Sequence, residues 1–203
     1  MSSPRIPFPT PEAMTPEQRK VYDRIVSGRR GTLVGPLRAA LHNADLADRW
    51  QALGEVLRYD TCLPGLLSEL AILIVARHWT SELEWTIHAA EARRAGLDEA
   101  AIEAIRRRKP PGFKSRAEVE IYDYCRELLI DGHVSDTVYA SVLGRWGILG
   151  VVELTALAGY YSMVAFTLNA HRIPLPDRIA AELCDDRQQI APLPPGAICI
   201  ASE

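Results

Sequence analysis

The chain lacks the short motifs that mark several large classes of enzyme. No segment matches a Gly-rich phosphate loop, a nucleophile elbow or a zinc-ligand pattern. Its four cysteines are scattered and include no CxxC pair, which argues against both a zinc site and a dithiol redox centre. The sequence therefore predicts no metal and no cofactor. Reduced cysteines that serve mainly for packing are typical of a cytoplasmic protein.

An excess of charge and long apolar runs are missing too. The net charge of −3 provides no electrostatic attraction to nucleic acid or to an anionic membrane. Residues 1–11 are polar and rich in proline, without the apolar core of a signal peptide. The longest apolar runs, such as 70–76, are too short to cross a bilayer. We therefore predict a cytoplasmic protein with neither a nucleic-acid nor a membrane partner.

Helical periodicity is present almost throughout the chain, and no convincing strand pattern appears. The hydrophobic fraction of 48% is enough to build the core of a single domain without disulfides or metal. We predict an all-α fold in three parts: an N-terminal arm (1–14), a helical domain (15–187) and a proline-containing tail (188–203). The tail is expected to be either disordered or docked on a neighbouring subunit.

Capping residues, glycines and prolines set the expected helix bounds. Ser81 with Glu84 has the spacing of a capping box and is expected to open one of these helices. Two helices, around 66–76 and 149–168, are apolar on most faces, so each must be buried on all sides. Because a chain of this size cannot easily bury both alone, we expect an oligomer. The expected helices are 16–27, 36–42, 45–59, 64–78, 81–95, 98–108, 115–130, 136–146, 149–169 and 177–185.

Candidate catalytic residues lie between positions 69 and 88. Glu84 and His88 are one helical turn apart on the same face, and Glu69 interrupts an otherwise apolar helix. A carboxylate beside a histidine can orient the ring and shift its pKa, as general acid–base catalysis requires. The pattern therefore indicates a proton-transfer site made of these three side chains.

Each of these residues also has a purely structural interpretation. Glu84 can act only as the capping-box partner of Ser81, and His88 can be a hydrogen-bonded core histidine. Glu69 can pair with Arg77 or with an arginine of another helix, because an unpaired buried carboxylate is very costly. The spacing is not of the HExxH type, so no metal ligand is assigned.

The same residues resemble a known family. Glu69, the segment ARHWTSELEWTIH (76–88) and the following AGL (95–97) resemble the core motif of the carboxymuconolactone decarboxylase/AhpD superfamily. The segment VVELTALAGYYSMVAFTLNA (151–170) resembles the last core helix of its decarboxylase-like branch. The resemblance covers roughly 49–176 and implies an AhpD-like helical bundle. It also implies a homo-oligomer, a trimer or hexamer, with the site near a subunit interface.

The AhpD branch of the superfamily uses a glutamate, a CxxC pair and a histidine. Glu69 and His88 stand at the glutamate and histidine positions here, whereas Ser81 and Glu84 stand where the cysteines would be. Peroxide reduction requires an attacking thiolate and a resolving thiol. The resemblance therefore argues against thiol peroxidase activity.

What remains of the resemblance implies a cofactor-independent carboxy-lyase. Its substrate would be a small carboxylated lactone or a related ring compound from aromatic compound catabolism. His88 is expected to donate the proton, with Glu84 orienting or relaying and Glu69 supporting the ring. The expected substrate-binding residues are Arg77, Trp85 and Ser81.

Two other functions stay open at this point. One is a peroxidase-related antioxidant protein, and the other is a non-catalytic oligomeric binding protein. The lyase hypothesis predicts an apolar pocket, on the order of a few hundred Å³, with His88 at its wall. The binding-protein hypothesis predicts that Glu69 and His88 are held in fixed bonds with no cavity beside them.

Overall fold

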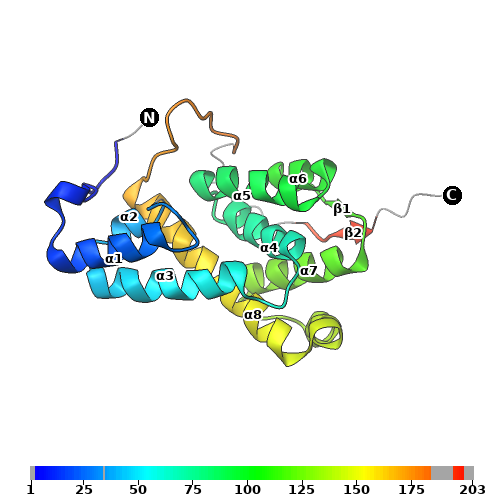
Figure 1. Ribbon diagram of the computed structural model, residues 1–203. Coiled ribbons are helices and arrows are strands. Elements are labelled where there is room, and N and C mark those ends of the chain that lie inside the picture. Colours follow the sequence, from blue (N-terminus) through cyan, green and yellow to red (C-terminus); the bar gives the residue numbers. More distant parts are fainter. Residues whose placement is uncertain (1–2, 34, 184–193, 199–203) are drawn as a thin grey trace.

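The computed structural model describes residues 3–33, 35–183 and 194–198, and this part of the chain is mostly helical (Figure 1). The all-α prediction is confirmed, because the strands β1 (Gly112–Phe113) and β2 (Ala197–Ile198) have two residues each. A short 3-10 helix, η1, spans Pro11–Ala13. The α-helices are α1 (Pro16–Ser27), α2 (Leu37–Ala40), α3 (Ala44–Tyr59), α4 (Gly65–His78), α5 (Glu82–Ala95), α6 (Glu99–Arg106), α7 (Arg116–Asp131) and α8 (Asp136–His171).

Most helices begin where the capping signals predict. Thr15 and Ser115 accept the N–H groups of Gln18 and Glu118, whose side chains bond back to the N-cap backbone. These reciprocal bonds form two complete capping boxes and satisfy N–H groups that have no partner within the helix. Side chains also cap α3, α6 and α8, from Asn43, Asp98 and Ser135.

Helix α4 is the centre of the fold. It packs against α5, α6, α7 and α8, and Figure 1 shows it between these helices. Every residue from Leu70 to Ala76 is at most 1% exposed. The expectation that this apolar helix needs a second subunit for its burial is therefore wrong, since four helices of its own chain cover it.

Helix α8 contains a break at Gly147, which divides it near the predicted boundary. Gly147 has φ 65° and ψ −170°, a conformation that glycine adopts without steric cost. By length and composition α8 could cross a membrane, with an 18-residue window of mean hydropathy 1.5. Half of that window is buried, and α8 packs against α3, α4, α5 and α7 as a core helix does.

The apolar surface of α8 is only partly covered. Ile148 is 75% exposed, and Leu149 and Val152 are each 58% exposed, just after the break at Gly147. Neighbouring exposed apolar side chains of this kind often mark a protein–protein contact. The physical argument for an oligomer thus applies to α8 and no longer to α4.

The predicted helix at 177–185 is wrong for the residues that the structure describes. Residues 173–183 contain no helix, and residues 184 and 185 lie outside the described part. A single turn forms where the N–H of Ile179 bonds to the carbonyl of Pro176. Arg178 in this turn has φ 69°, which is incompatible with continuing a right-handed helix.

Residues 194–198 of the predicted tail dock on their own chain. Strand β2 pairs in parallel with β1, so that Gly112 faces Ala197 and Phe113 faces Ile198. The Tyr122 hydroxyl donates a hydrogen bond of 2.6 Å to the carbonyl of Pro194. For these residues, both expected states of the tail, disorder and docking on a neighbouring subunit, are wrong. The other residues of 188–203 lie outside the described part.

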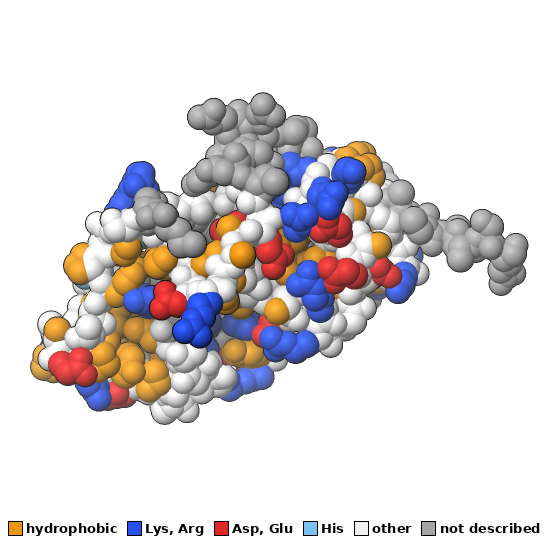
Figure 2. Space-filling view, turned by 90° about the horizontal axis from the view of Figure 1, so that it is seen from above, with side chains coloured by type: hydrophobic (Ala, Val, Ile, Leu, Met, Phe, Trp, Pro, Cys, Tyr) orange, Lys and Arg blue, Asp and Glu red, His pale blue; other side chains and the backbone are white. Residues whose placement is uncertain are grey.

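Charges of both signs lie close together around α5 and α6. Figure 2 shows acidic and basic side chains gathered side by side on one half of the molecule. Arg106 and Arg107 at the basic end of α6 both pair with Glu103, and Arg93 pairs with Glu99. These pairs offset part of the positive charge at the end of α6, where cations also interact favourably with the helix dipole.

Candidate functional site

The turn between α4 and α5 brings the candidate site together. Thr80 lies in the left-handed region at φ 48°, which is unusual for a β-branched residue. The N–H of Ser81 then reaches back to the carbonyl of Ala76 at 2.8 Å, as in a Schellman motif. This tight turn folds α5 back against α4, so that His88 of α5 meets Glu69 of α4.

His88 lies between two carboxylates. Its Nδ1 is 2.7 Å from Glu69 Oε2, and its Nε2 is 3.1 Å from Glu84 Oε1. The ring is 3% exposed, and burial by itself disfavours the charged form. The hydrogen bonds to Glu69 and Glu84 outweigh burial and raise the pKa of His88 to about 9. At neutral pH the ring is therefore an imidazolium that donates both of its N–H groups.

The predicted capping box of Ser81 and Glu84 does not form. Ser81 makes no capping bond, and its buried Oγ has no hydrogen-bond partner among the described residues. Glu84 bonds instead to His88, one turn further along α5. The charged ring is a stronger donor than a backbone N–H, which explains the choice.

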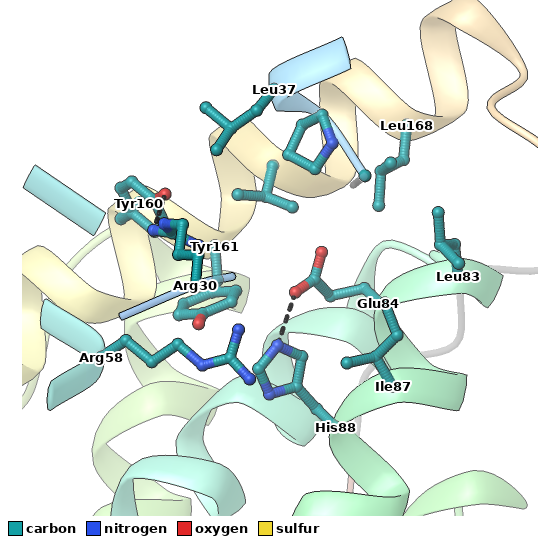
Figure 3. A pocket seen from close by; sticks show the side chains of 13 residues that line it. Arg30, Leu37, Arg58, Leu83, Glu84, Ile87, His88, Tyr160, Tyr161 and Leu168 are labelled. Carbon is teal, nitrogen blue, oxygen red and sulfur yellow. Dashed lines mark hydrogen bonds and ion pairs between the residues drawn. The ribbon is translucent and has the colours of Figure 1, made fainter. Parts of the chain in front are cut away.

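A pocket lies in front of Glu84 and His88 (Figure 3). Its volume is about 70 Å³, roughly half of the ~150 Å³ in an engineered apolar cavity that holds benzene. The predicted position beside His88 is confirmed. The predicted size is wrong, because long polar side chains enter the space. The apolar wall comprises Leu37, Leu83, Ile87, Val164 and Leu168, and the polar groups are Arg30, Arg58, Glu84, His88, Tyr160 and Tyr161.

Five separate parts of the chain contribute to this pocket, one of them the start of α2 with Leu37. Helix α5 provides Glu84 and His88, and α8 provides the two tyrosines. Arg30 comes from the loop after α1, and Arg58 comes from the last turn of α3. Sequence reasoning missed both arginines, because neither belongs to a motif or lies near the 69–88 cluster. Tyr160 and Tyr161, two polar rings in an otherwise apolar helix, were the further sequence signal for this pocket besides Glu84 and His88.

Tyr161 packs its ring against His88. The two ring centroids are 5.1 Å apart in an edge-to-face arrangement, and Tyr160 packs on Tyr161 at 5.2 Å. Burial holds the pKa of Tyr161 well above its ordinary value, and the nearby charge of Glu84 acts in the same direction. Tyr161 is therefore a neutral phenol at the wall of the pocket, where it can donate a hydrogen bond.

The three residues predicted to bind substrate are not in the pocket wall. Arg77 is 2% exposed, and its Nε donates to the carbonyl of Arg106 at 2.7 Å. Trp85 is fully buried, and its indole N–H donates to Glu182. Ser81 is also fully buried. The structure thus brings together the three predicted catalytic residues but leaves the predicted substrate-binding residues elsewhere.

Within 3–33, 35–183 and 194–198, no three His, Cys, Asp or Glu side chains are grouped so as to hold a metal ion. The arrangement holds a buried cation between two carboxylates and presents Glu84 to a small, half-open pocket.

Comparison with known proteins identifies the fold. No protein-family model matches the chain, and no curated protein matches it. Solved structures do match: a peroxidase-related protein from Silicibacter sp. TM1040 has a TM-score of 0.69 at 14% identity, covering 86% of this chain and 92% of that one. An AhpD-core, peroxidase-related protein from Ralstonia eutropha JMP134 also has a TM-score of 0.69, at 13% identity, covering 86% and 93%.

A third similar structure is an enzyme. The debrominase Bmp8, solved in complex with 2,3,4-tribromopyrrole, has a TM-score of 0.65 at 14% identity and covers 87% of this chain and 94% of its own. Together these likenesses show that the chain has the AhpD-like fold. The sequence resemblance to the AhpD-like superfamily is thus confirmed at the level of the fold, which also carries enzymes.

Proposed function

We propose that the protein is a cofactor-independent carboxy-lyase of the carboxymuconolactone decarboxylase type. Its substrate would be a small carboxylated lactone or a related ring compound. The observation that supports this most directly is the hydrogen-bonded series Glu69–His88–Glu84 beside a pocket, with a charged His88 held between the two carboxylates. Replacement of a carboxylate by a proton requires a proton source beside the substrate, and the buried imidazolium next to this partly apolar pocket can supply it.

The geometry favours a different order of roles from that expected from the sequence. Both ring nitrogens of His88 are already bonded to carboxylates. Glu84 Oε1 accepts from the ring, whereas Glu84 Oε2 has no hydrogen bond to any described residue. In the proposal Glu84 is therefore the group that touches substrate. His88 is the proton source behind it, and Glu69 is a positioning residue that fixes the ring.

The proposed reaction balances without a further reagent. The bond between the ring carbon and its carboxylate breaks, CO₂ leaves, and the electron pair moves into the conjugated lactone carbonyl as a dienolate. The dienolate carbon then takes the proton that His88 supplies through Glu84. His88 becomes neutral and regains a proton from solvent. The product carries one hydrogen in place of the lost carboxylate.

The apolar part of the wall supports this chemistry. Leu83, Val164 and Leu168 give the pocket an apolar side, where solvation is poorer than in bulk water. A carboxylate that loses CO₂ is a localised charge, whereas the dienolate spreads its charge over the ring, so poor solvation disfavours the first more than the second. The neutral phenol of Tyr161 can donate a hydrogen bond to the developing oxyanion.

The decisive experiment is a CO₂-release assay on a panel of carboxylated five-membered lactones in D₂O. We expect one deuterium in the product, and a loss of about 100-fold or more in kcat for Glu84→Gln and His88→Gln. Glu99→Gln is the matched control, because Glu99 pairs with Arg93 outside the pocket. Turnover that is equal in all four proteins would rule out the proposed roles.

The peroxidase-related alternative lacks support from the described thiols. Cys125 is fully buried, and burial raises the pKa of its thiol to about 12, which suppresses the thiolate. Cys62 is exposed. The pKa of its thiol is also raised, first by partial loss of solvent around the sulfur and then by the carboxylate of Glu153. Neither thiol lines the pocket. Cys184 and Cys199 lie outside the described residues.

The binding-protein alternative made two predictions, and one of them agrees with the structure. Glu69 and His88 are held in fixed bonds as it predicts, but a pocket lies beside them. As further parts of the proposal, we infer a cytoplasmic homo-oligomer, a trimer or hexamer, that acts on a small molecule without nucleic-acid or membrane partners. The exposed apolar residues after Gly147 support the oligomer.

A further inference from the structure

Arg30 and Arg58 are half-buried cations, and Glu69 and Glu91 act on Arg58 only through longer-range attraction. Neither makes an ion pair with any described residue, and the buried Arg30 Nε has no hydrogen-bond partner there. Among the residues that the structure describes, Arg30 makes one hydrogen bond, a long one of 3.5 Å from Nη2 to the Tyr160 hydroxyl. A guanidinium that is removed from water in this way is costly unless an anion satisfies it.

The two arginines face the same pocket. Figure 3 shows them on the side opposite Leu83, next to Tyr160 and Tyr161. With His88 protonated, the wall holds three positive charges and one negative charge, that of Glu84, and thus a net charge of +2. Counting Glu69 behind His88 still leaves +1. In a site with apolar walls, this excess attracts an anion strongly.

A glycine in α3 leaves the space that the side chain of Arg30 occupies at the pocket. Gly54 of α3 lies against the ends of two pocket side chains, and a Cβ at this position would overlap Arg30 Nη2 and Tyr160 Oη. Glycine in the middle of a helix lowers helix stability by roughly 0.5–1 kcal/mol relative to alanine. The close approach gives a reason for its presence, since only glycine leaves room for both side chains.

We propose that Arg30 and Arg58 form an anion subsite that binds a carboxylate of a small organic acid. This deepens the proposed function by naming the residues that would recognise a charged group of its substrate. The carboxylate held by the arginines is not the one that is lost. A cation paired with the departing carboxylate would stabilise the ground state more than the transition state and so slow the reaction. The subsite therefore holds a carboxylate that keeps its charge.

Binding of 2-furoate and of its neutral isostere 2-furamide tests the subsite without any turnover. Calorimetry and saturation-transfer NMR would compare the wild type with Arg30→Met, Arg58→Met and the double variant. We expect the wild type to bind 2-furoate at least about tenfold more tightly than 2-furamide. Each single variant should bind 2-furoate at least about tenfold more weakly than the wild type does, with no change in its affinity for 2-furamide. Arg58→Lys should retain part of the affinity because it keeps the charge.

Arg29→Gln is the matched control, since Arg29 is next to Arg30 in sequence but pairs with Asp60 on the surface. Circular dichroism would show that each variant is folded. The proposal is overturned if the wild type does not bind 2-furoate or if the double variant binds it equally well. It is also overturned if the substitutions weaken the binding of 2-furoate and of 2-furamide by the same factor. Glu84→Gln should still bind 2-furoate, so failure of the lyase proposal and failure of the subsite are distinguishable.

Discussion

The carboxylate of Glu84 takes the Nε2–H of His88, 3.1 Å away, although Glu84 has the sequence position of a helix-capping residue. This choice couples the first turn of α5 to the charge on a buried ring. It leaves the Ser81 hydroxyl without a partner among the described residues. The local stability of the helix start is thus reduced in favour of a charged cluster, a pattern more typical of functional sites than of structural ones.

The titration of His88 is the first property to measure. We expect NMR of the ring nitrogens to give a pKa of about 9 in the wild type. Glu69→Gln should lower this pKa, because the variant removes a charged acceptor from Nδ1 but keeps the side-chain volume. Glu91→Gln should leave it unchanged. A wild-type pKa near the ordinary 6.5 would contradict the charged cluster.

Folding stability should fall at alkaline pH. The pKa of His88 rises from 6.5 to about 9 on folding, so its contribution is fully present below 6.5 and is lost as pH rises through 9. The loss is on the order of 3 kcal/mol, from 1.36 kcal/mol per pKa unit. Urea unfolding of the wild type and of His88→Gln between pH 6 and 10 measures it. Parallel curves for the two proteins would show that His88 is not responsible.

His78 should act in the opposite direction. Its burial, followed by repulsion from Arg108, lowers the pKa of the ring to about 4. The unfolded chain therefore binds an extra proton between pH 6.5 and 4, and stability falls as pH drops through this range. We expect His78→Phe to reduce this acid sensitivity while keeping the edge-to-face contact with Trp79. Urea midpoints at pH 7 and pH 4.5 for both proteins provide the measurement.

Gly54→Ala should separate stability from binding. A Cβ would overlap the tip of Arg30, a flexible side chain that can move aside, and the hydroxyl end of the buried Tyr160 ring, which must shift with it. Alanine also improves helix propensity by roughly 0.5–1 kcal/mol. We therefore expect a thermal midpoint within a few degrees of wild type, but weaker binding of 2-furoate. Gly65→Ala is the control, since a Cβ there meets no atom. Equal binding by both variants would argue against the role of Gly54.

The proposed oligomer can be tested by changing an exposed apolar residue after the break in α8. A carboxylate at Val152, which is 58% exposed, should not disturb the monomer but should oppose an apolar contact between subunits. We expect light scattering to show a trimer or hexamer for the wild type and smaller species for Val152→Glu. Ile179→Glu, at a position that is 38% exposed, is the comparison. A monomeric wild type would remove this part of the proposal.

Local signals predicted most of the fold. The capping boxes of α1 and α7 depend on residues three apart, and so they can be found without knowing the rest of the structure. The predicted helix at 177–185 fails for a local reason that propensity does not show, the left-handed backbone of Arg178. The burial of α4 could not be judged from its own sequence, because it depends on how four other helices surround it.

The candidate site was predictable only in part. Glu69, Glu84 and His88 lie within two adjacent helices, so helical spacing and the family motif were enough to find them. Arg30 and Arg58 reach the same pocket from a different region, and no periodicity relates them to position 88. Trp85 and Arg77 were misleading because large polar side chains near a motif can equally serve to join helices.

The pocket is assembled from two regions of the chain with different tasks. The proton-handling residues lie on α4 and α5, whereas both arginines lie on the segment between α1 and α4. Selection, or an engineer, could therefore replace the segment 28–58 and change which acids are accepted while leaving the proton chemistry in place. Related proteins with this fold could then differ in the acids they accept as substrates while sharing the same proton-transfer residues.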